Sequence, residues 1–206
     1  RRMQAAVAPF AADHFITPMA AVAGSVAEEI LGAMLRVALL DRAYVNNGGD
    51  IALHLMRGER FSVGLVDRPD SDGVMRGMTI EADDPVRGIA TSGRHGRSFS
   101  FGIADAVTAL AATASQADAA ATIIANAVDC PCHPAITRLP ANELQPASDL
   151  GDRLVTRAVG ELSQQDIAAA LDSGAECARQ LFDRGLIEGA VLQLCGDMIV
   201  VGPKHV

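Results

Sequence analysis

An alanine-rich stretch at residues 115–127 limits what this chain can fold into. Its sequence, SQADAAATIIANA, contains neither Lys nor Glu, the residues that usually cover an exposed helix face. Three polar residues, Asp118, Thr122 and Asn126, recur every fourth position, which places them on one face of a helix. A carboxylate and a hydroxyl one turn apart can share a hard cation, because Mg²⁺ and Ca²⁺ prefer oxygen ligands. The stripe therefore predicts a metal site at Asp118 and Thr122.

A structural role is also open for Asp118. The pattern Ser115-x-x-Asp118 resembles a capping box, in which the carboxylate would neutralise the start of its own helix. This interpretation does not account for Thr122 and Asn126 in the same stripe.

A loop rich in glycine and serine precedes this helix. It supplies Ser92, His95, Ser98 and Ser100, with few bulky side chains among them. Together with the stripe, this loop indicates a place where a small anionic ligand meets a metal ion.

The cluster Asn46-Asn47-Gly48-Gly49 is a turn signal. Glycine tolerates positive φ, so the pair fits a hairpin turn between two strands. It equally fits a backbone that lets a ligand come close, and the sequence leaves both interpretations open.

The order of the remaining segments predicts an α+β fold. Helices are expected at residues 18–40, with Thr17 as N-cap and Pro18 in the first turn, and at residues 163–184. Strands outnumber the helices that could link parallel neighbours, so we expect an antiparallel sheet with helices on one face. The expected strands cover residues 43–45, 50–56, 61–66, 74–82, 86–91, 98–102, 104–111, 135–139, 153–159, 190–194 and 198–201. An exposed loop is expected at residues 68–73 and a short tail at residues 204–206.

Composition bounds the classes of function. A chain of 206 residues is expected to form a single domain over residues 1–206. It is 50% hydrophobic but only 3% aromatic, so the core must consist of Ala, Val, Leu and Ile. The net charge of −8 argues against nucleic acid, which requires clustered Lys and Arg.

The segment at residues 18–40 is long enough to cross a membrane. Glu28, Glu29 and Arg36 within it favour a buried helix of a soluble protein instead, because charges are costly in lipid. The chain begins Arg1-Arg2-Met3, so we expect its native N-terminal segment to be missing, and an export signal could lie there.

The four cysteines are Cys130, Cys132, Cys177 and Cys195. They favour unpaired thiols in a cytoplasmic protein. The run Cys130-Pro131-Cys132-His133 is a weak zinc signal, because no second ligand pair follows it.

Three segments, in this order, resemble the ApbE-like superfamily. They are TPMAAVAG at residues 17–24, NGGDI at residues 47–51, and a third that runs from TSG at residues 91–93 to ADAAAT at residues 117–122. The third includes SFSFG at residues 98–102 and ADAVT at residues 104–108. The superfamily is best known for flavin transferases, which use FAD and Mg²⁺ to attach FMN to a Thr or Ser of a target protein. The resemblance is closest to its uncharacterised branch of small proteins and covers nearly the whole chain.

This resemblance implies a T-fold-like α+β architecture and a flavin beside the turn at Gly48 and Gly49. It also puts Asp118 and Thr122 at the positions of metal-binding residues, and His95 where the transferases have a histidine. The expected cofactors are Mg²⁺ and FAD or FMN. The residues expected to bind the flavin or a similar anionic ligand are Asn47, Gly48, Gly49, Asp50, Ser92 and Ser98.

The sequence departs from the transferases on the first helix. Transferases typically carry Ala-Lys-Gly-Tyr there, whereas this chain has Val22-Ala23-Gly24-Ser25. A lysine suits a phosphate as a point charge, so its loss weakens the expected pyrophosphate binding and puts flavin transfer in doubt.

Three functions follow. The first is a Mg²⁺-dependent flavin or nucleotide enzyme, FMN-transferase-like or FAD pyrophosphate-cleaving, in which His95 or Asp105 assists as a proton donor or acceptor. The second is a binding module that holds a flavin or another anionic ligand without transferring it. The third is an assembly protein, and homo-oligomers formed through sheet edges are compatible with all three. For His95 the alternative is a loop imidazole without a partner, and for Asp105 a carboxylate that caps loop amides.

Overall fold

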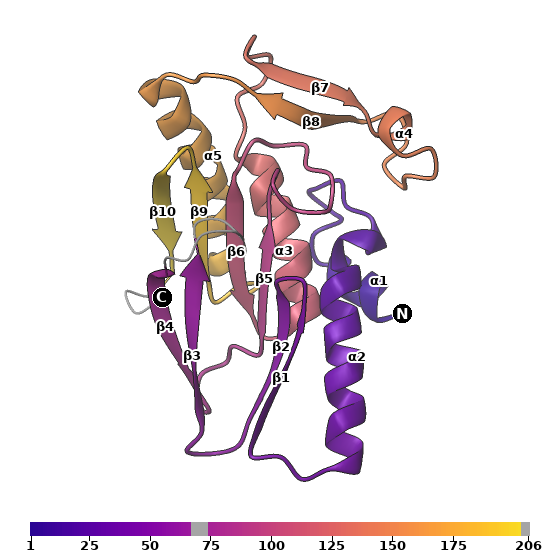
Figure 1. The fold of residues 1–206 in the computed structure, drawn as a ribbon, viewed down its shortest axis with the longest axis vertical. Helices are drawn as coiled ribbons and strands as arrows, with labels where there is room; N and C mark the ends of the chain where they lie inside the picture. Colours follow the sequence, from indigo (N-terminus) through magenta and orange to yellow (C-terminus); the bar gives the residue numbers. More distant parts are fainter. Residues whose placement is uncertain (67–73, 203–206) are drawn as a thin grey trace.

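The computed structural model describes residues 1–66 and 74–202. Its centre is a six-stranded antiparallel sheet in the order β1-β2-β5-β6-β9-β10 (Figure 1). The α+β class and the antiparallel sheet are therefore confirmed, whereas the loop and tail expected at residues 68–73 and 204–206 lie outside the described residues. The strands of this sheet are β1 Arg42–Asn47, β2 Asp50–Leu55, β5 Gly88–Ser92, β6 Ala106–Ala111, β9 Gly189–Leu194 and β10 Asp197–Val201.

Three long helices cover one face of the sheet, and a hairpin covers part of the other (Figure 1). The hairpin pairs β3 Arg60–Val66 with β4 Val74–Glu81. The long helices are α2 Val22–Val37, α3 Ala114–Ala127 and α5 Gln164–Asp183, and the short ones are α1 Arg2–Val7, η1 Pro18–Ala21 and α4 Ala141–Leu144.

Strand β6 shows why the sheet has two differently packed faces. Val107, Ala109 and Ala111 alternate along it and lie in the core beneath the helices. Leu110 points the other way and packs with residues of the β3–β4 hairpin, such as Met78 and Ile80. Because successive side chains of a strand point to opposite faces, this alternation fixes the register of the central strand.

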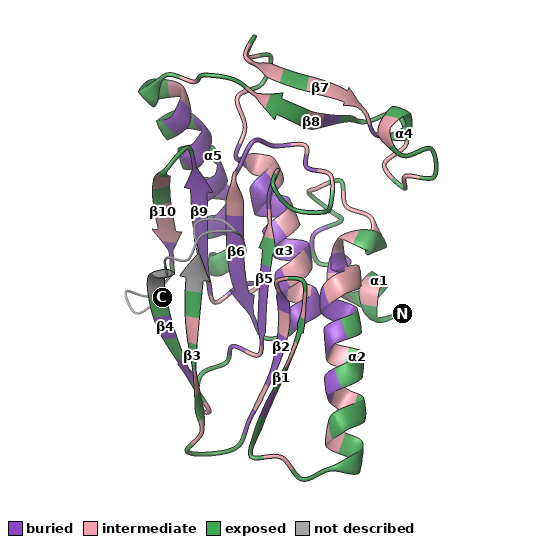
Figure 2. Ribbon diagram, viewed as in Figure 1, coloured by how far each residue is buried: buried purple, intermediate pink, exposed green. Residues whose placement is uncertain are grey.

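Helix α3 lies at the centre of the helical layer. Ala117, Ala120, Ala121 and Ile124 are fully buried, and the helix appears largely purple in Figure 2. It contacts α2 on one side, α5 on the other, and strands β5 and β6 beneath. The small alanine side chains let these elements pack closely against α3. The helix that carries the predicted polar stripe is therefore largely buried.

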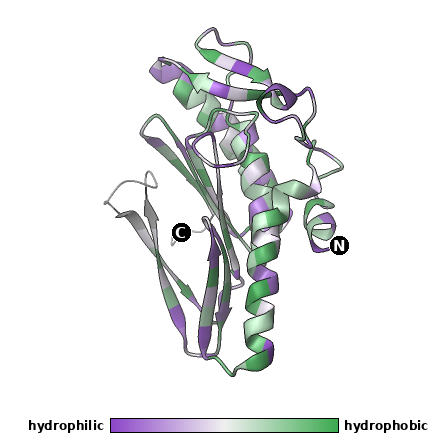
Figure 3. Cartoon of the chain, turned by 45° about the vertical axis from the view of Figure 1, so that its right-hand side comes forward, coloured by the Kyte–Doolittle hydropathy of each residue, from purple (hydrophilic) through white to green (hydrophobic). Residues whose placement is uncertain are grey.

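Helix α2 is covered on one side only. Its inner side buries Gly24, Ala27 and Leu31, whereas Val26 and Ile30 on its outer side are 42% and 47% exposed. Figure 3 shows hydrophobic and hydrophilic residues following one another along this helix. Pro18–Val37 is long and apolar enough to cross a membrane. This is weak evidence for a span, since a core helix of a soluble protein can pass the same test.

Two features of the helix ends differ from expectation. The N-cap of α3 is Thr113, whose side chain accepts a hydrogen bond from the amide of Gln116, so the capping box proposed at Ser115 is wrong. Helix α2 ends at Val37 rather than at residue 40. Pro18 does open the helical segment, although as a 3-10 turn.

The strand expected at residues 98–102 is also wrong. The backbone groups of this segment find partners outside the sheet. The amide of Phe101 donates to Asn126 Oδ1 at 2.9 Å, and the amide of Thr156 donates to the carbonyl of Ser100 at 2.8 Å. The segment therefore runs as a loop across the end of α3.

A small arm extends beyond the main layers (Figure 1). It pairs β7 Ile136–Pro140 with β8 Leu154–Val159, and α4 lies between them in the chain. The arm brings residues 145–150, which follow α4, to the cavity described below.

Candidate functional site

A cavity of about 410 Å³ opens where five segments far apart in the chain meet. These are residues 15–26 around the start of α2, the β1–β2 turn, the loop at residues 91–101, the polar face of α3 and residues 145–150 of the arm. The volume lies within the range of about 300–1,000 Å³ that is typical of small-molecule sites.

The three residues of the polar stripe all line this cavity. Asp118 Oδ2 accepts a hydrogen bond from the amide of Gly24 at 2.9 Å, so it caps α2 rather than its own helix. Asn126 Oδ1 accepts from the amide of Phe101 and, at 3.3 Å, from Ser100 Oγ, and so it holds the loop. Within residues 1–66 and 74–202 the Thr122 hydroxyl has no hydrogen-bond partner. The stripe thus contains two residues with structural bonds and one that is free to bind a ligand.

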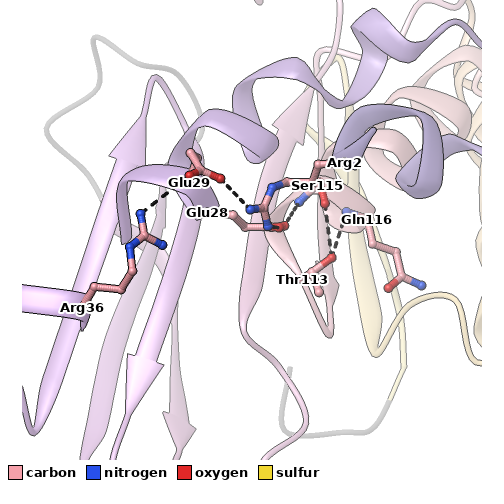
Figure 4. A network of polar contacts seen from close by, with 7 residues as sticks. All are labelled: Arg2, Glu28, Glu29, Arg36, Thr113, Ser115 and Gln116. Atoms are coloured by element: carbon pink, nitrogen blue, oxygen red, sulfur yellow. Dashed lines mark hydrogen bonds and ion pairs between the residues drawn. The ribbon is translucent and has the colours of Figure 1, made fainter. Parts of the chain in front are cut away.

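Helices α2 and α3 cap each other, because each places a carboxylate at the N-terminus of the other. While Asp118 of α3 binds the start of α2, Glu28 of α2 accepts from the amide of Ser115 at 2.6 Å. Glu28 also pairs with Arg2 at 2.6 Å (Figure 4). Carboxylates near helix N-termini are favourable, because the exposed amides and the helix dipole attract negative charge. These two hydrogen bonds fix where Asp118 lies relative to the cavity.

A second carboxyl group, that of Asp50 at the start of β2, faces the same cavity. The residue is only 8% exposed. Its Oδ1 atom is buried and has no hydrogen-bond partner among the described residues. The pKa of Asp50 is raised to about 8, mainly by burial and also by the nearby Asp118 carboxylate, while the positive charge of Arg97 opposes both effects.

Burial also raises the pKa of Asp118, to about 6. Its hydrogen bonds from the amides of Gly24 and Ala23 act in the opposite direction, because they favour the charged form. The raised pKa values show that the charged forms of both carboxyl groups are disfavoured in this cavity, and a cation bound beside them would favour those charged forms.

The β1–β2 turn is a two-residue hairpin loop that also lines the cavity. Asn47 pairs with Asp50 across it, and Gly48 and Gly49 have φ values of +72° and +110°. A Cβ atom at Gly48 would lie 1.8 Å from Arg97 Nη2. The hairpin interpretation of the glycines is therefore confirmed, and Gly48 also lets the Arg97 side chain approach the backbone. The approach of a ligand at this turn stays a prediction.

Aromatic rings form another part of the wall. Phe15, Phe99 and Phe101 line the cavity, and the ring centroids of Phe15 and Phe101 are 6.0 Å apart. The Arg153 guanidinium lies 3.5 Å from the centroid of Phe15. The Thr17 hydroxyl donates to the carboxylate of Asp149. These contacts connect the arm to the segment before α2.

The predicted ligand-binding residues are mostly brought together. The cavity is lined by Asn47, Gly48, Asp50, Ser92 and Ser98, together with the predicted metal ligands Asp118 and Thr122. Gly49 is not among the lining residues.

The predicted catalytic residues, His95 and Asp105, are not among the lining residues either. Asp105 accepts hydrogen bonds from Arg94 Nε at 2.7 Å and from the amide of Cys195 at 2.6 Å. His95 Nε2 lies 3.2 Å from Asp105 Oδ1. These contacts match the alternative role of Asp105 as a carboxylate that caps loop amides, and the catalytic role of both residues stays a prediction.

The four cysteines are unpaired. In the Cys130–His133 turn, Cys130 Sγ contacts the carbonyl of Asp166 at 3.4 Å, and His133 Nε2 lies 3.5 Å from Asp166 Oδ2. No group of three or more His, Cys, Asp or Glu side chains that could hold a metal occurs within the described part of the chain.

The lining residues that the sequence did not predict include Phe15, Arg97 and Asp149. Arg97 lies between Ser92 and Ser98 in the loop that was predicted to contribute to the site, so its positive charge could have marked it. Phe15 and Asp149 come from connecting segments whose positions depend on the arm, and no local pattern marked them.

The fold and the cavity define an α+β protein with a partly acidic cavity that is lined by residues of its helices, its sheet and its loops. The family model described as AbpE bacteria matches residues 1–200, and the chain belongs to that family. It is also similar to archaeal proteins named UPF0280. The one from Methanothermobacter thermautotrophicus is 40% identical over 121 residues, covering 56% of this chain and 44% of the relative. The one from Methanopyrus kandleri is 42% identical over 128 residues, covering 60% and 46%. The match therefore spans less than half the length of these relatives.

Proposed function

We propose that the cavity binds Mg²⁺ at Asp118 and Thr122 together with the phosphate end of a flavin or related nucleotide, and that the protein is a Mg²⁺-dependent enzyme acting on that ligand. The observation that carries this proposal is the polar face of α3. A carboxylate and a free hydroxyl one turn apart lie on a largely buried, alanine-rich helix and line the cavity.

The donor set fits a hard cation. Both ligands offer oxygen, which Mg²⁺ prefers over nitrogen or sulfur. Mg²⁺ typically keeps several waters and is bound by one or two carboxylates together with phosphate oxygens of a substrate. A site without a cluster of three acidic or imidazole groups therefore suits Mg²⁺ that arrives with a phosphorylated ligand. When bound, Mg²⁺ would supply charge stabilisation at a phosphoryl group.

The rest of the cavity suits the remainder of such a ligand. Among the described lining residues Arg97 is the one cation, and a guanidinium can form paired hydrogen bonds with phosphate oxygens. Phe15, Phe99 and Phe101 offer apolar ring surface against which a flavin or a base can stack. The polar and aromatic parts match the two ends of a nucleotide.

A second function, a binding module without turnover, is favoured by two observations. The start of α2 has no lysine, since Lys204 is the single lysine in the chain. His95 and Asp105 also lie outside the set of residues that line the cavity. Under this alternative the same ligand binds and no bond is broken.

Ligand binding can be tested by the melting temperature of the purified chain with FAD, FMN or ADP, each with Mg²⁺ or with EDTA. Stabilisation of about 2.7 kcal/mol is expected at a hundred times Kd. We expect Asp118→Asn to remove the Mg²⁺-dependent part of the shift, while Asp172→Asn, a change on the exposed side of α5, retains it. Absence of a shift with every ligand and Mg²⁺ would rule out both functions.

Turnover separates the two functions. Incubation of the protein with FAD and Mg²⁺, followed by chromatography, should give AMP and FMN if the protein is an enzyme that cleaves the pyrophosphate. Tight FAD binding with FAD recovered intact would leave the binding module.

A further inference from the structure

Two segments from different layers of the fold, each carrying a carboxyl group, are bonded to the first turn of α2. Asp118 of α3 binds the amide of Gly24. The neighbouring residue, Ala23, accepts a hydrogen bond through its carbonyl from Asn47 Nδ2 at 3.2 Å, and Asn47 pairs directly with Asp50 across the hairpin turn. The β1–β2 turn and the acidic residue of α3 are thus attached to adjacent residues of one helix, and both carboxyl groups line one cavity.

Asp50 has no structural task that explains its burial. Buried polar side-chain atoms are nearly always hydrogen-bonded, and each exception requires an explanation. Asp50 is 8% exposed, and its Oδ1 atom has no partner among the described residues. Asp118, by contrast, has the amide of Gly24. A carboxylate oxygen that is buried, faces a cavity and lacks a donor is suited to a cation.

The positive group that lines the cavity does not satisfy this oxygen atom. Arg97 lies over Gly48 at the turn and is exposed. Its charge reaches Asp50, yet Oδ1 stays without a hydrogen bond. Arg97 is therefore available to bind an anion in the cavity. The position between the two carboxyl groups suits a smaller cation.

We propose that Asp50 is a second carboxylate ligand of the divalent cation, which then links the β1–β2 turn to helix α3. This inference rests on the proposed function and extends it, because the earlier ligand set contains only Asp118 and Thr122. Two carboxylates and a hydroxyl give the cation three hard oxygen ligands from the protein. Waters and phosphate oxygens complete its coordination.

The test is a titration of the full chain with Mn²⁺, a Mg²⁺ substitute whose free concentration is measured by electron paramagnetic resonance. We expect one bound Mn²⁺ per chain. Asp50→Asn keeps the shape and removes the charge, and it should weaken Mn²⁺ binding at least about tenfold, since even outer-shell changes cost roughly 10–100-fold. Asp172→Asn is the matched control, because it removes one exposed acidic charge far from the lining residues.

The outcomes separate the two proposals. Normal Mn²⁺ binding by wild type and by Asp50→Asn, together with its loss in Asp118→Asn, would overturn the role of Asp50 and leave the proposed site intact. Failure of wild type to bind Mn²⁺, alone or with ADP, would overturn both. If Asp50→Asn does not fold, the wild-type protein still tests whether Asp50 binds the cation. Saturating Mg²⁺ should shift the side-chain ¹³Cγ resonances of both Asp50 and Asp118, and a shift confined to Asp118 contradicts the inference.

Discussion

At the scale of single residues, Asp118 both caps a helix and lines the cavity. Its Oδ2 atom holds the start of α2 through the amide of Gly24, and its carboxylate lines the cavity. An asparagine at this position can still accept the hydrogen bond from Gly24, whereas an alanine cannot. Asp118→Asn is therefore the informative variant for a metal role, and Asp118→Ala would combine the loss of charge with the loss of a helix cap.

The pKa values of Asp50 and Asp118 predict how the stability of the metal-free protein depends on pH. Both are raised in the folded state, to about 8 and about 6, above the unfolded value of about 3.9. The folded state then binds more protons than the unfolded state, so the free energy of unfolding falls as pH rises from about 4 to about 8. Melting temperatures in EDTA should show this decline.

Asp50→Asn provides the comparison for this prediction. Because an amide does not titrate, the variant should lose less stability than wild type over the same pH range, and it should melt higher than wild type at pH 8. Parallel curves for the two proteins would mean that Asp50 titrates as it does in the unfolded chain.

How far the sequence predicts the site is also decided residue by residue. The spacing of Asp118, Thr122 and Asn126 depends only on helix geometry, and all three line the cavity as that spacing required. Their individual tasks depend on other segments. Asn126 holds the amide of Phe101, a contact between residues 25 positions apart that no local pattern contains.

At the scale of elements, helices α2 and α3 touch where α2 has a glycine. A Cβ atom at Gly24 would lie 2.3 Å from the carbonyl oxygen of Ala114, so Gly24→Ala forces the helices apart. We expect a cost of roughly 1–3 kcal/mol, as is usual for overpacking. Urea unfolding would measure it.

Gly32 offers a matched control on the same helix. A Cβ atom there meets only the Arg36 side chain, at 3.5 Å, and alanine is favoured over glycine inside a helix by up to about 1 kcal/mol. Gly32→Ala should therefore stabilise the protein slightly. A similar loss of stability for both variants would show that the α2–α3 contact is not the cause.

The capping signals in the sequence show where element prediction succeeds and fails. Ser163 and Asp166 form a capping box at the start of α5, where the sequence predicts a helix from residue 163, because the pattern and its contacts are local. The similar pattern at Ser115 fails, since Thr113 caps α3 and the amide of Ser115 is taken by Glu28 from α2. At the start of α3, a tertiary contact from another helix therefore replaced the capping box that the local pattern indicated.

At the scale of the whole molecule, the cavity exists only when five distant segments are assembled, so ligand and cation should affect each other's binding. If Mg²⁺ tightens FAD binding by some factor, FAD must tighten Mg²⁺ binding by the same factor. We expect FAD titrations followed by flavin fluorescence to give a Kd at least about fivefold lower with Mg²⁺ than with EDTA.

Asp118→Asn should reduce this difference to nothing, because the proposed cation ligand is then lost. Equal FAD affinity with and without Mg²⁺ in wild-type protein would contradict a cation that binds next to the phosphates. The edge strands β1 and β10 are where the predicted homo-oligomer would form, and this stays a prediction, as does a cytoplasmic location.

The order of the sheet has a consequence for synthesis of the chain on the ribosome. Its inner pair joins Ala109 of β6 to Ala190 of β9, so the arm and α5 must be translated before the pair can close. At about 5–20 residues per second, the alanine-rich surface of α3 stays without α5 and β9 for several seconds in the nascent chain. During that interval the helix that will carry the polar stripe offers an apolar surface to molecular chaperones.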